Sequence, residues 1–316
     1  MYFPFLYGRR SEFLAVRAML GDPRDLSALV PVFEPINANA ADLTRCLDEC
    51  EDQQQPSVVI VNPTRHQLAN GANRVAWFQT VSAVLGRCLS AAPAFQTSDY
   101  TTGAEMRAAL GAFPRRDVAV VHSGAGLTDA DVRRAANDGR IAWHIVIGNK
   151  LPDRQRILLP AAKTVVVRDG FIKQVRNADY DGQEFFSDLY RTYPPAAGFG
   201  DFLCLGSGFQ DGGSTPAAVA IHAAYKKPTT NDLWMEHFIS DDTAIDVGDV
   251  AGKFLQAARH LVNAARRRPG EFGSNQALDE YRSCVNTGYY PGLPTNKKYQ
   301  IIHHMCVTLD VLSGAL

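Results

Sequence analysis

The stretch SVVIVNPTRHQLANGANRVAWFQTVSAVLGRCLSAAPAFQTSD (57–99) decides the fold class of this chain. It opens with the β-rich run 57–63, continues with a segment of helical period over 73–89, and closes with a second β-rich run over 93–99. Strands that alternate with helices in this way are typical of a parallel sheet whose strands are joined by crossover helices. The stretch therefore predicts an α/β fold.

The same alternation extends through the first two hundred residues. The β-rich runs are 2–8, 29–37, 57–63, 93–99, 117–124, 141–149, 163–171 and 201–209. A helix is expected over 181–193, ahead of the last run. Nearly continuous apolar runs are typical of strands buried on both faces. About eight such strands favour a (β/α)₈ TIM-like barrel over 1–209, with an open doubly wound sheet as the alternative.

The remainder, 210–316, is expected to be a C-terminal appendage. A β-hairpin is predicted from the runs 218–226 and 233–240, which the turn formers of KPTTND join. Helices are predicted over 249–267 and 298–312. Because no low-complexity linker separates this part, we expect it to pack on the barrel within the same domain.

Composition excludes several classes of protein. A formal net charge of -1 gives no overall field for nucleic acid or an anionic membrane. Six scattered cysteines with no Cys-x-x-Cys pair indicate reduced thiols, and no apolar run is long enough for a membrane span. The short apolar N-terminus does not match a signal peptide. We therefore expect a cytoplasmic protein without membrane contact.

Polar residues follow most of the predicted strands, where the active site of a (β/α)₈ barrel is built. They are Arg9, Arg10, Glu12, Glu34, Asn62, Asp99, His122, Ser123, Asn149, Lys150, Arg168, Asp169 and Ser207. Glu34 stands out because it interrupts an apolar strand, where an ionised carboxylate is costly unless it is paired or catalytic. The alternative for each residue is a hydrogen bond to loop backbone.

Three of these residues are predicted to be catalytic, namely Glu34, Asp99 and His122. Two carboxylates and an imidazole on one rim suit acid–base chemistry. Glu34 and Asp99 are also the candidate ligands of a divalent cation, Mg²⁺ or Mn²⁺. Arg10 is expected to pair with Glu34 across adjacent strands, and its guanidinium could grip a phosphate.

A glycine-rich segment, GSGFQDGGSTP (206–216), follows the last predicted strand. Loops at this place in barrels often bind phosphate through backbone N–H groups. No Walker or dinucleotide fingerprint is present, and a lid or a plain turn cluster is the alternative. The predicted ligand-binding residues are Arg10, Asn62, Arg168, Ser207, Gly208, Gly212 and Gly213.

Three other clusters favour a structural interpretation. His303 and Cys306 have helical spacing, but a closing helix explains them better than a metal site. His222 on one strand of the hairpin and Glu236-His237 on the other could face each other, and a cross-strand pair explains them better than a site. The basic run 266–268 suits the C-terminus of a helix and leaves a modest docking surface.

Five segments carry a resemblance to a known family: MYFPFLYGRRSE (1–12), FEPIN (33–37), GDFLCLGSGF (200–209), AVAIHAAY (218–225) and DVAGKF (249–254). In these segments the chain resembles the phage beta-type protein family, a bacterial group met in gene neighbourhoods linked to defence against phage. The resemblance implies a cytoplasmic, barrel-like protein that acts in defence beside a partner from a neighbouring gene, such as a nuclease. It implies no reaction and no site residues.

Two hypotheses follow for function. The first is an enzyme, or a relic of one, that acts on a phosphate-containing ligand, with a metal-dependent phosphoester hydrolase or phosphodiesterase as the candidate activity. The alternative is a non-catalytic subunit that binds a partner through the hairpin, the basic helix end and the C-terminal helix. Direct nucleic-acid binding is disfavoured, because aromatic and basic residues do not alternate along the chain.

Overall fold

The computed structural model describes residues 1–210 and 216–316, which form two compact units. Unit 1 consists of residues 1–21, 25–169 and 189–202. Unit 2 consists of residues 22–24, 170–188 and the described part of 203–316. The units are interleaved in sequence, because the connection after the seventh barrel strand contributes its residues to unit 2.

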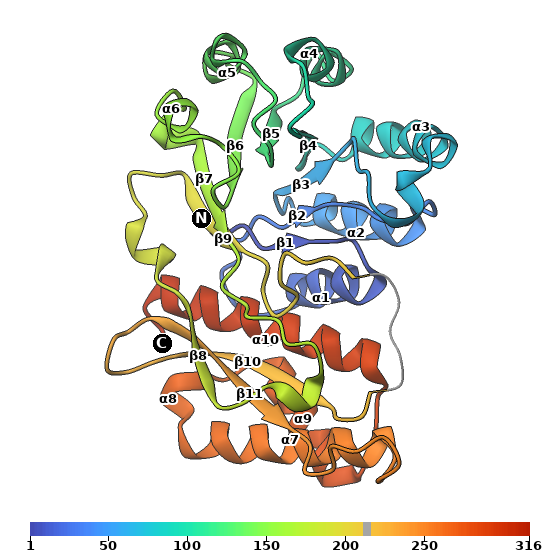
Figure 1. The fold of residues 1–316 in the computed structure, drawn as a ribbon, viewed down its shortest axis with the longest axis vertical. Helices are drawn as coiled ribbons and strands as arrows, with labels where there is room; N and C mark the ends of the chain where they lie inside the picture. Colours follow the sequence, from blue (N-terminus) through green and yellow to red (C-terminus); the bar gives the residue numbers. More distant parts are fainter. Residues whose placement is uncertain (211–215) are drawn as a thin grey trace. The chain divides into compact units, whose positions relative to one another are not determined.

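Unit 1 is a barrel of eight parallel strands within the described residues (Figure 1). They are β1 (Phe5–Leu6), β2 (Val32–Phe33), β3 (Ser57–Ile60), β4 (Ala91–Gln96), β5 (Val118–His122), β6 (Ile141–Ile147), β7 (Thr164–Arg168) and β9 (Gly198–Asp201). The strands lie side by side in chain order, and a bridge between Tyr2 and Phe199 joins the last strand to the first. The predicted (β/α)₈ TIM-like barrel is confirmed, and the open sheet is excluded.

Glycine allows the barrel to close. A Cβ added at Gly200 would collide with the backbone carbonyl of Phe3, so only a residue without a side chain lets β9 approach β1 this closely. The Phe3 N–H then donates to the carbonyl oxygen of Phe199 at 2.8 Å. This closure corrects the predicted last strand, which runs over 198–201 instead of 201–209.

Helices surround the strands of unit 1 (Figure 1). They are α1 (Arg10–Leu20), α2 (Ala41–Asp52), α3 (Gly71–Arg87), α4 (Gly103–Gly111), α5 (Asp129–Ala136) and α6 (Asp153–Arg156), with short 3₁₀ turns η1 (His66–Ala69), η2 (Ala161–Lys163) and η4 (Leu189–Thr192). In α2 the buried residues Leu43, Cys46, Leu47 and Cys50 share one helical face. The side-chain oxygens of Asn70, Thr102 and Thr128 cap α3, α4 and α5.

Unit 2 contains a three-stranded antiparallel sheet and four helices among its described residues. The elements are β8 (Gln183–Ser187), β10 (Ala220–Lys226), β11 (Leu233–Ile239), η3 (Asn177–Asp179), α7 (Val250–Arg267), α8 (Pro269–Phe272), α9 (Gln276–Thr287) and α10 (Leu293–Ser313). The hairpin predicted from the sequence is the β10–β11 pair. The helix expected over 181–193 is wrong, since its residues form β8 on the free edge of β11, followed by η4.

Helix α10 forms the core of unit 2, and every residue of 299–311 is buried. His303 lies between the side chain of Asn275 and the carbonyl oxygen of Ala224. The segment that contains His303 and Cys306 is therefore a core helix. No helix in residues 1–210 or 216–316 combines the length and the apolar character that crossing a membrane requires.

Candidate active site

The mouth of the barrel is the opening at the carboxyl ends of its strands. Because successive residues of a strand point to opposite faces, only every second side chain points into the barrel and can reach this mouth. The Phe3 and Trp143 rings meet at 5.6 Å although β1 and β6 are not neighbours, so both rings point into the barrel. On β2, Phe33 contacts Phe13 of α1 at 5.2 Å and therefore points outward. Glu34, the next residue, points inward.

The strand registers extend this inner face to the mouth. Phe5 pairs with Val32, Val32 with Val58, and Val58 with Ala92. Continued in steps of two residues, these inward positions reach the carboxyl ends of four adjacent strands. The side chains placed there are Tyr7, Glu34, Asn62 and Gln96.

Glu34 is the centre of this group. Its side chain is 2% exposed, and its Oε1 accepts a hydrogen bond from Nε of Arg65 at 2.8 Å. Its Oε2 is buried without a hydrogen-bond partner among the described residues. Burial raises the pKa of Glu34, and the charge and hydrogen bond of Arg65, together with the nearby Gln96 amide, only partly oppose this shift. The raised pKa means that Glu34 binds a proton more readily than an exposed glutamate does.

Arg65 lies in the loop between β3 and η1, and its side chain is 40% exposed. The guanidinium carbon is 5.5 Å from the centroid of the Tyr7 ring. Its Nε donates a hydrogen bond to Glu34. The two terminal nitrogens form the planar fork with which a guanidinium binds phosphate or carboxylate. Arg65 therefore joins the buried acid to the solvent side of the mouth.

Glu12, in the first turn of α1, is a second buried carboxyl group. Burial raises its pKa to about 7, against the opposing effects of the Arg9 charge and of backbone hydrogen bonds from Arg9, Tyr7 and Gly8. Its Oε2 also has no hydrogen-bond partner among the described residues. A carboxyl group with this pKa can exchange a proton near neutral pH.

Gly8 determines how closely the β1–α1 loop, which leads to Glu12, approaches the end of β2, which carries Glu34. It has φ +64, which favours glycine, and a Cβ at this position would press on Pro35 and on the Phe13 ring. The β1–α1 loop can therefore turn closely against the residue that follows Glu34. The loop brings the Glu12 helix turn next to the end of β2.

The Tyr7 hydroxyl lies within the electrostatic influence of the charged side chains around Glu34. Burial raises the pKa of its hydroxyl, and the negative charges of Glu34, Asp169 and Glu12 raise it further, while Arg65 lowers it. The hydroxyl therefore keeps its proton and can act as a hydrogen-bond donor. Four charged side chains thus act on one phenol at the mouth.

The Asn62 side chain is hydrogen-bonded to the backbone of the neighbouring strand. Its Nδ2 donates to the carbonyl oxygen of Gln96, and its Oδ1 accepts from the N–H of Gln96, both at 2.8 Å. These two bonds use the amide to join the ends of β3 and β4. Asn62 therefore positions Gln96, whose side chain reaches Glu34.

Asp99 is exposed and does not meet Glu34. Its Oδ1 accepts a hydrogen bond from the N–H of Ala125 at 2.9 Å, which ties the β4–α4 loop to the β5–α5 loop. Gly124 and Gly126 permit this contact, because a Cβ at either position would collide with the backbone of the 98–101 loop. The structure assigns Asp99 to loop backbone.

His122 faces the wrong side of the sheet for catalysis at the mouth. Trp143 points inward and pairs with Ala119, so His144 and His122 point outward to the layer beneath the helices. His122 Nε2 lies 3.2 Å from His144 Nδ1. Burial lowers the pKa of His122 to about 3 and that of His144 to about 4, so both imidazoles are neutral. The predicted trio of Glu34, Asp99 and His122 is not brought together.

The other predicted ligand residues are dispersed. Arg10 is exposed at the start of α1, and Glu34 pairs with Arg65 instead of Arg10. Arg168 alternates with the inner Val167 and is paired in register with Asp201. Ser207 and Gly208 are exposed residues of unit 2, and Gly212 and Gly213 lie outside the described residues.

The predicted Mg²⁺ or Mn²⁺ site does not fit these side chains. Glu34 is engaged by a cation, Arg65, and Asp99 by a backbone amide, so the two carboxylates share no site. In the described ranges, no group of three or more His, Cys, Asp or Glu side chains is arranged to hold a metal ion. The groups at or next to the mouth that can take part in chemistry are the carboxyl groups of Glu34 and Glu12 and the guanidinium of Arg65.

Comparison with known proteins adds no functional residue. No family model matches this sequence, and no curated protein is significantly similar to it. Sequence reasoning missed Tyr7, Arg65 and Gln96. A signal for Arg65 exists, since it follows the 57–63 run by two residues, but nothing in the sequence favours it over Arg10 as the partner of Glu34.

Proposed function

We propose that this protein is an enzyme that binds a phosphate-bearing substrate at the barrel mouth and transfers a proton through Glu34. One observation carries the proposal. The buried Oε2 of Glu34 has no hydrogen-bond partner among the described residues, while Arg65 and Tyr7 stand beside the same carboxylate. An unsatisfied buried carboxylate oxygen in a barrel mouth is costly for a merely structural residue.

The residues have complementary tasks in this proposal. The Arg65 fork and the Tyr7 hydroxyl bind oxygens of the substrate phosphate. Glu34 takes a proton from a water molecule as its oxygen attacks phosphorus, and the proton remains on Oε2. Glu12, with a pKa of about 7, supplies a proton to the departing alkoxide. This reaction is phosphoester hydrolysis.

The biological setting belongs to the same proposal. The resemblance to the phage beta-type family supports a role in bacterial defence against phage, beside a partner such as a nuclease. The six cysteines are buried free thiols, which suits the reducing cytoplasm. A phosphoester substrate agrees with such a role, since nucleotides and nucleic acids carry this group.

The non-catalytic alternative has less support in the described residues. Helix α10, one of the three surfaces expected to dock a partner, is buried along 299–311. Arg268, in the basic run after α7, pairs with Glu236 at 2.6 Å and with Glu271 at 3.1 Å. Helix α10 therefore offers no open face over 299–311, whereas Arg266 and Arg267 of the basic run stay exposed.

The test compares two carboxylates of the rim. With a chromogenic phosphodiester such as bis-p-nitrophenyl phosphate, Glu34→Gln should lower kcat about 100-fold or more, because an amide cannot take the proton. Asp99→Asn is the matched control and should keep kcat within about twofold. Equal activity in Glu34→Gln and the wild type would contradict the proposal, as would a wild type without phosphoesterase activity.

A further inference from the structure

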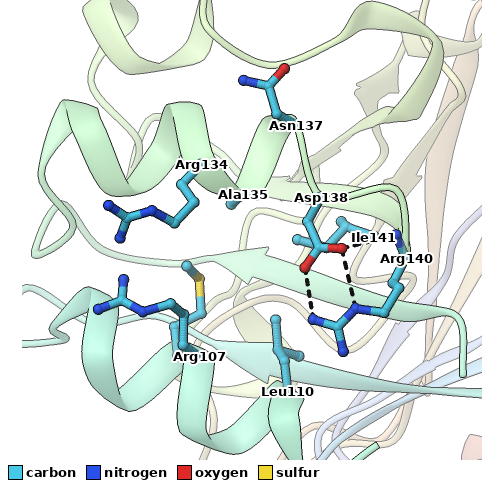
Figure 2. Close-up of a pocket in the computed structure, with 9 residues that line it drawn as sticks. Arg107, Leu110, Arg134, Ala135, Asn137, Asp138, Arg140 and Ile141 are labelled. Atoms are coloured by element: carbon cyan, nitrogen blue, oxygen red, sulfur yellow. Dashed lines mark hydrogen bonds and ion pairs between the residues drawn. The ribbon is translucent and has the colours of Figure 1, made fainter. Parts of the chain in front are cut away.

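A second hollow lies on the outside of unit 1, between α4 and α5 (Figure 2). It measures about 570 Å³, which is within the usual size range of small-molecule sites. Its apolar floor consists of the buried side chains Met106, Leu110, Ala135 and Ile141. Ile141 is the first residue of β6, so the hollow lies toward the amino ends of the strands, away from Glu34.

Two arginines border this floor. Figure 2 shows the guanidinium groups of Arg107 and Arg134 on the same side of the hollow. Arg107 extends from α4 and Arg134 from α5, and their side chains are 47% and 60% exposed. A polar edge beside an apolar floor is the arrangement that recognises an amphiphilic ligand.

The two guanidinium groups share a single carboxylate. Nη1 of Arg107 lies 3.0 Å and Nη1 of Arg134 lies 3.4 Å from the same oxygen of Asp131. One negative charge therefore faces two positive charges, so one positive charge has no ion-pair partner among the residues that the structure describes. A guanidinium has several N–H donors, so each arginine can bind a further oxygen while it contacts Asp131.

Asp131 is itself fixed in place. Its Oδ2 accepts a hydrogen bond from the Thr128 hydroxyl at 2.7 Å. A Cβ at Gly103 would overlap with the Asp131 carboxylate, so the glycine at the start of α4 makes room for it. The acid thus orients both arginines from a rigid position.

Arg140, on the same hollow, provides an internal contrast. Its Nε and Nη2 contact the two oxygens of Asp138 at 3.2 and 2.8 Å, which closes a two-point ion pair (Figure 2). The Arg140 charge is therefore compensated. The uncompensated charge of the hollow belongs to Arg107 and Arg134.

We propose that this hollow binds a small organic anion with an apolar body, its phosphate or carboxylate held by Arg107 and Arg134 and its body resting on Met106 and Leu110. The site is separate from the Glu34 mouth and does not depend on the reaction proposed there. A ligand that lacks either part uses only half of the hollow. Inorganic phosphate and an uncharged phenol should both bind more weakly than a molecule that combines them.

Isothermal titration at low salt tests this with four probes: phenyl phosphate, benzoate, inorganic phosphate and phenol. Phenyl phosphate or benzoate should bind at least about fivefold more tightly than the last two, and the better of the two identifies the head group. Arg107→Ala and Arg134→Ala should each weaken binding of that probe about tenfold, the effect of one charged hydrogen bond. Asp131→Asn removes the competing negative charge but keeps a side-chain oxygen that can orient both arginines, so it should tighten binding.

Two controls localise the effect. Arg133→Ala removes an exposed arginine of the same helix that does not line the hollow and should leave affinity unchanged. Arg107→Lys keeps the charge but loses the planar fork, so it should weaken binding less than Arg107→Ala if the anion is bound by charge and geometry together. Circular dichroism verifies that each variant is folded.

Several results would overturn the proposal. One is equal affinity for phenyl phosphate and inorganic phosphate, or the same loss in Arg133→Ala as in Arg107→Ala. If Arg65→Ala abolished binding of the probe while Arg107→Ala and Arg134→Ala did not, the probe would bind at the mouth and not in the hollow. Tighter binding of an oligoglutamate peptide than of any small probe, through the same two arginines, would make the hollow a peptide-docking surface.

Discussion

The β1–β3 side and the β4–β6 side of the barrel both carry a buried pair of titratable residues, with opposite consequences. On the first side, Glu34 lies at the mouth and Glu12 in the first turn of α1, and each has a buried oxygen without a partner among the described residues. On the second side, His122 and His144 point outward and contact each other at 3.2 Å. For Glu34 and His122, the position within the pleat decides whether the side chain points to the mouth or to the layer beneath the helices.

The largest expected difference between the two sides is in the pH dependence of stability. The pKa of Glu12 is raised from 4.5 to about 7, so between these values the folded protein holds a proton that the unfolded chain has released. Its contribution is complete below pH 4.5 and is lost as the pH rises through 7, by about 3 kcal/mol. Glu12→Gln should remove this fall in urea-denaturation curves.

The histidine pair should give the opposite slope. The pKa of His122 is lowered from 6.5 to about 3, so between these values the unfolded chain binds a proton that the folded protein does not. Its contribution is complete above pH 6.5 and is lost as the pH falls toward 3. His122→Gln should reduce this loss of stability at acidic pH. If the free energy of unfolding depended on pH in the same way in Glu12→Gln and His122→Gln, the two sides would not differ.

The next effect concerns Arg65, the cation beside Glu34 on the β1–β3 side. Arg65→Ala should raise KM about 30-fold, since it removes a charged two-point contact with phosphate worth about 2 kcal/mol. Arg10→Ala is the matched control, because Arg10 is exposed and has no part in the Glu34 ion pair. A KM that changes as much in Arg10→Ala would restore Arg10 as the ligand residue predicted from sequence.

The smallest effect concerns Asn62, which joins the two sides. Asn62→Ala removes two hydrogen bonds to Gln96 and should lower the free energy of unfolding by about 1 to 2 kcal/mol. Because Gln96 also contacts Glu34, kcat should fall only a few fold. A loss of kcat as large as that in Glu34→Gln would place Asn62 in direct contact with the substrate.

Much of the fold could be predicted from the sequence, because the alternation of apolar runs and helical segments is a local signal. Glu34 could be predicted as well, since a carboxylate in an apolar strand is conspicuous. The placement of the last strand was less accessible. It depends on Gly200 fitting beside Phe3, a contact between the two ends of the barrel.

The errors at the site have one physical origin. The side-chain direction of His122 depends on the register of β5 with β4, in which its neighbour Val121 pairs with the inward-pointing Gln96. A one-residue difference turns a residue from the mouth to the helix layer. The pairing of Glu34 with Arg65 likewise depends on how the β3–η1 loop folds back, which no local pattern encodes.

The most direct test of the proposed catalytic role of the mouth is to locate a bound phosphate analogue. A crystal structure with tungstate, whose position is identified by its anomalous signal, should show the anion against the terminal nitrogens of Arg65, beside the Glu34 carboxylate. The same crystals of Arg65→Ala should lose this anion. Tungstate absent from the mouth in the wild type, at a concentration that inhibits turnover, would contradict the assignment.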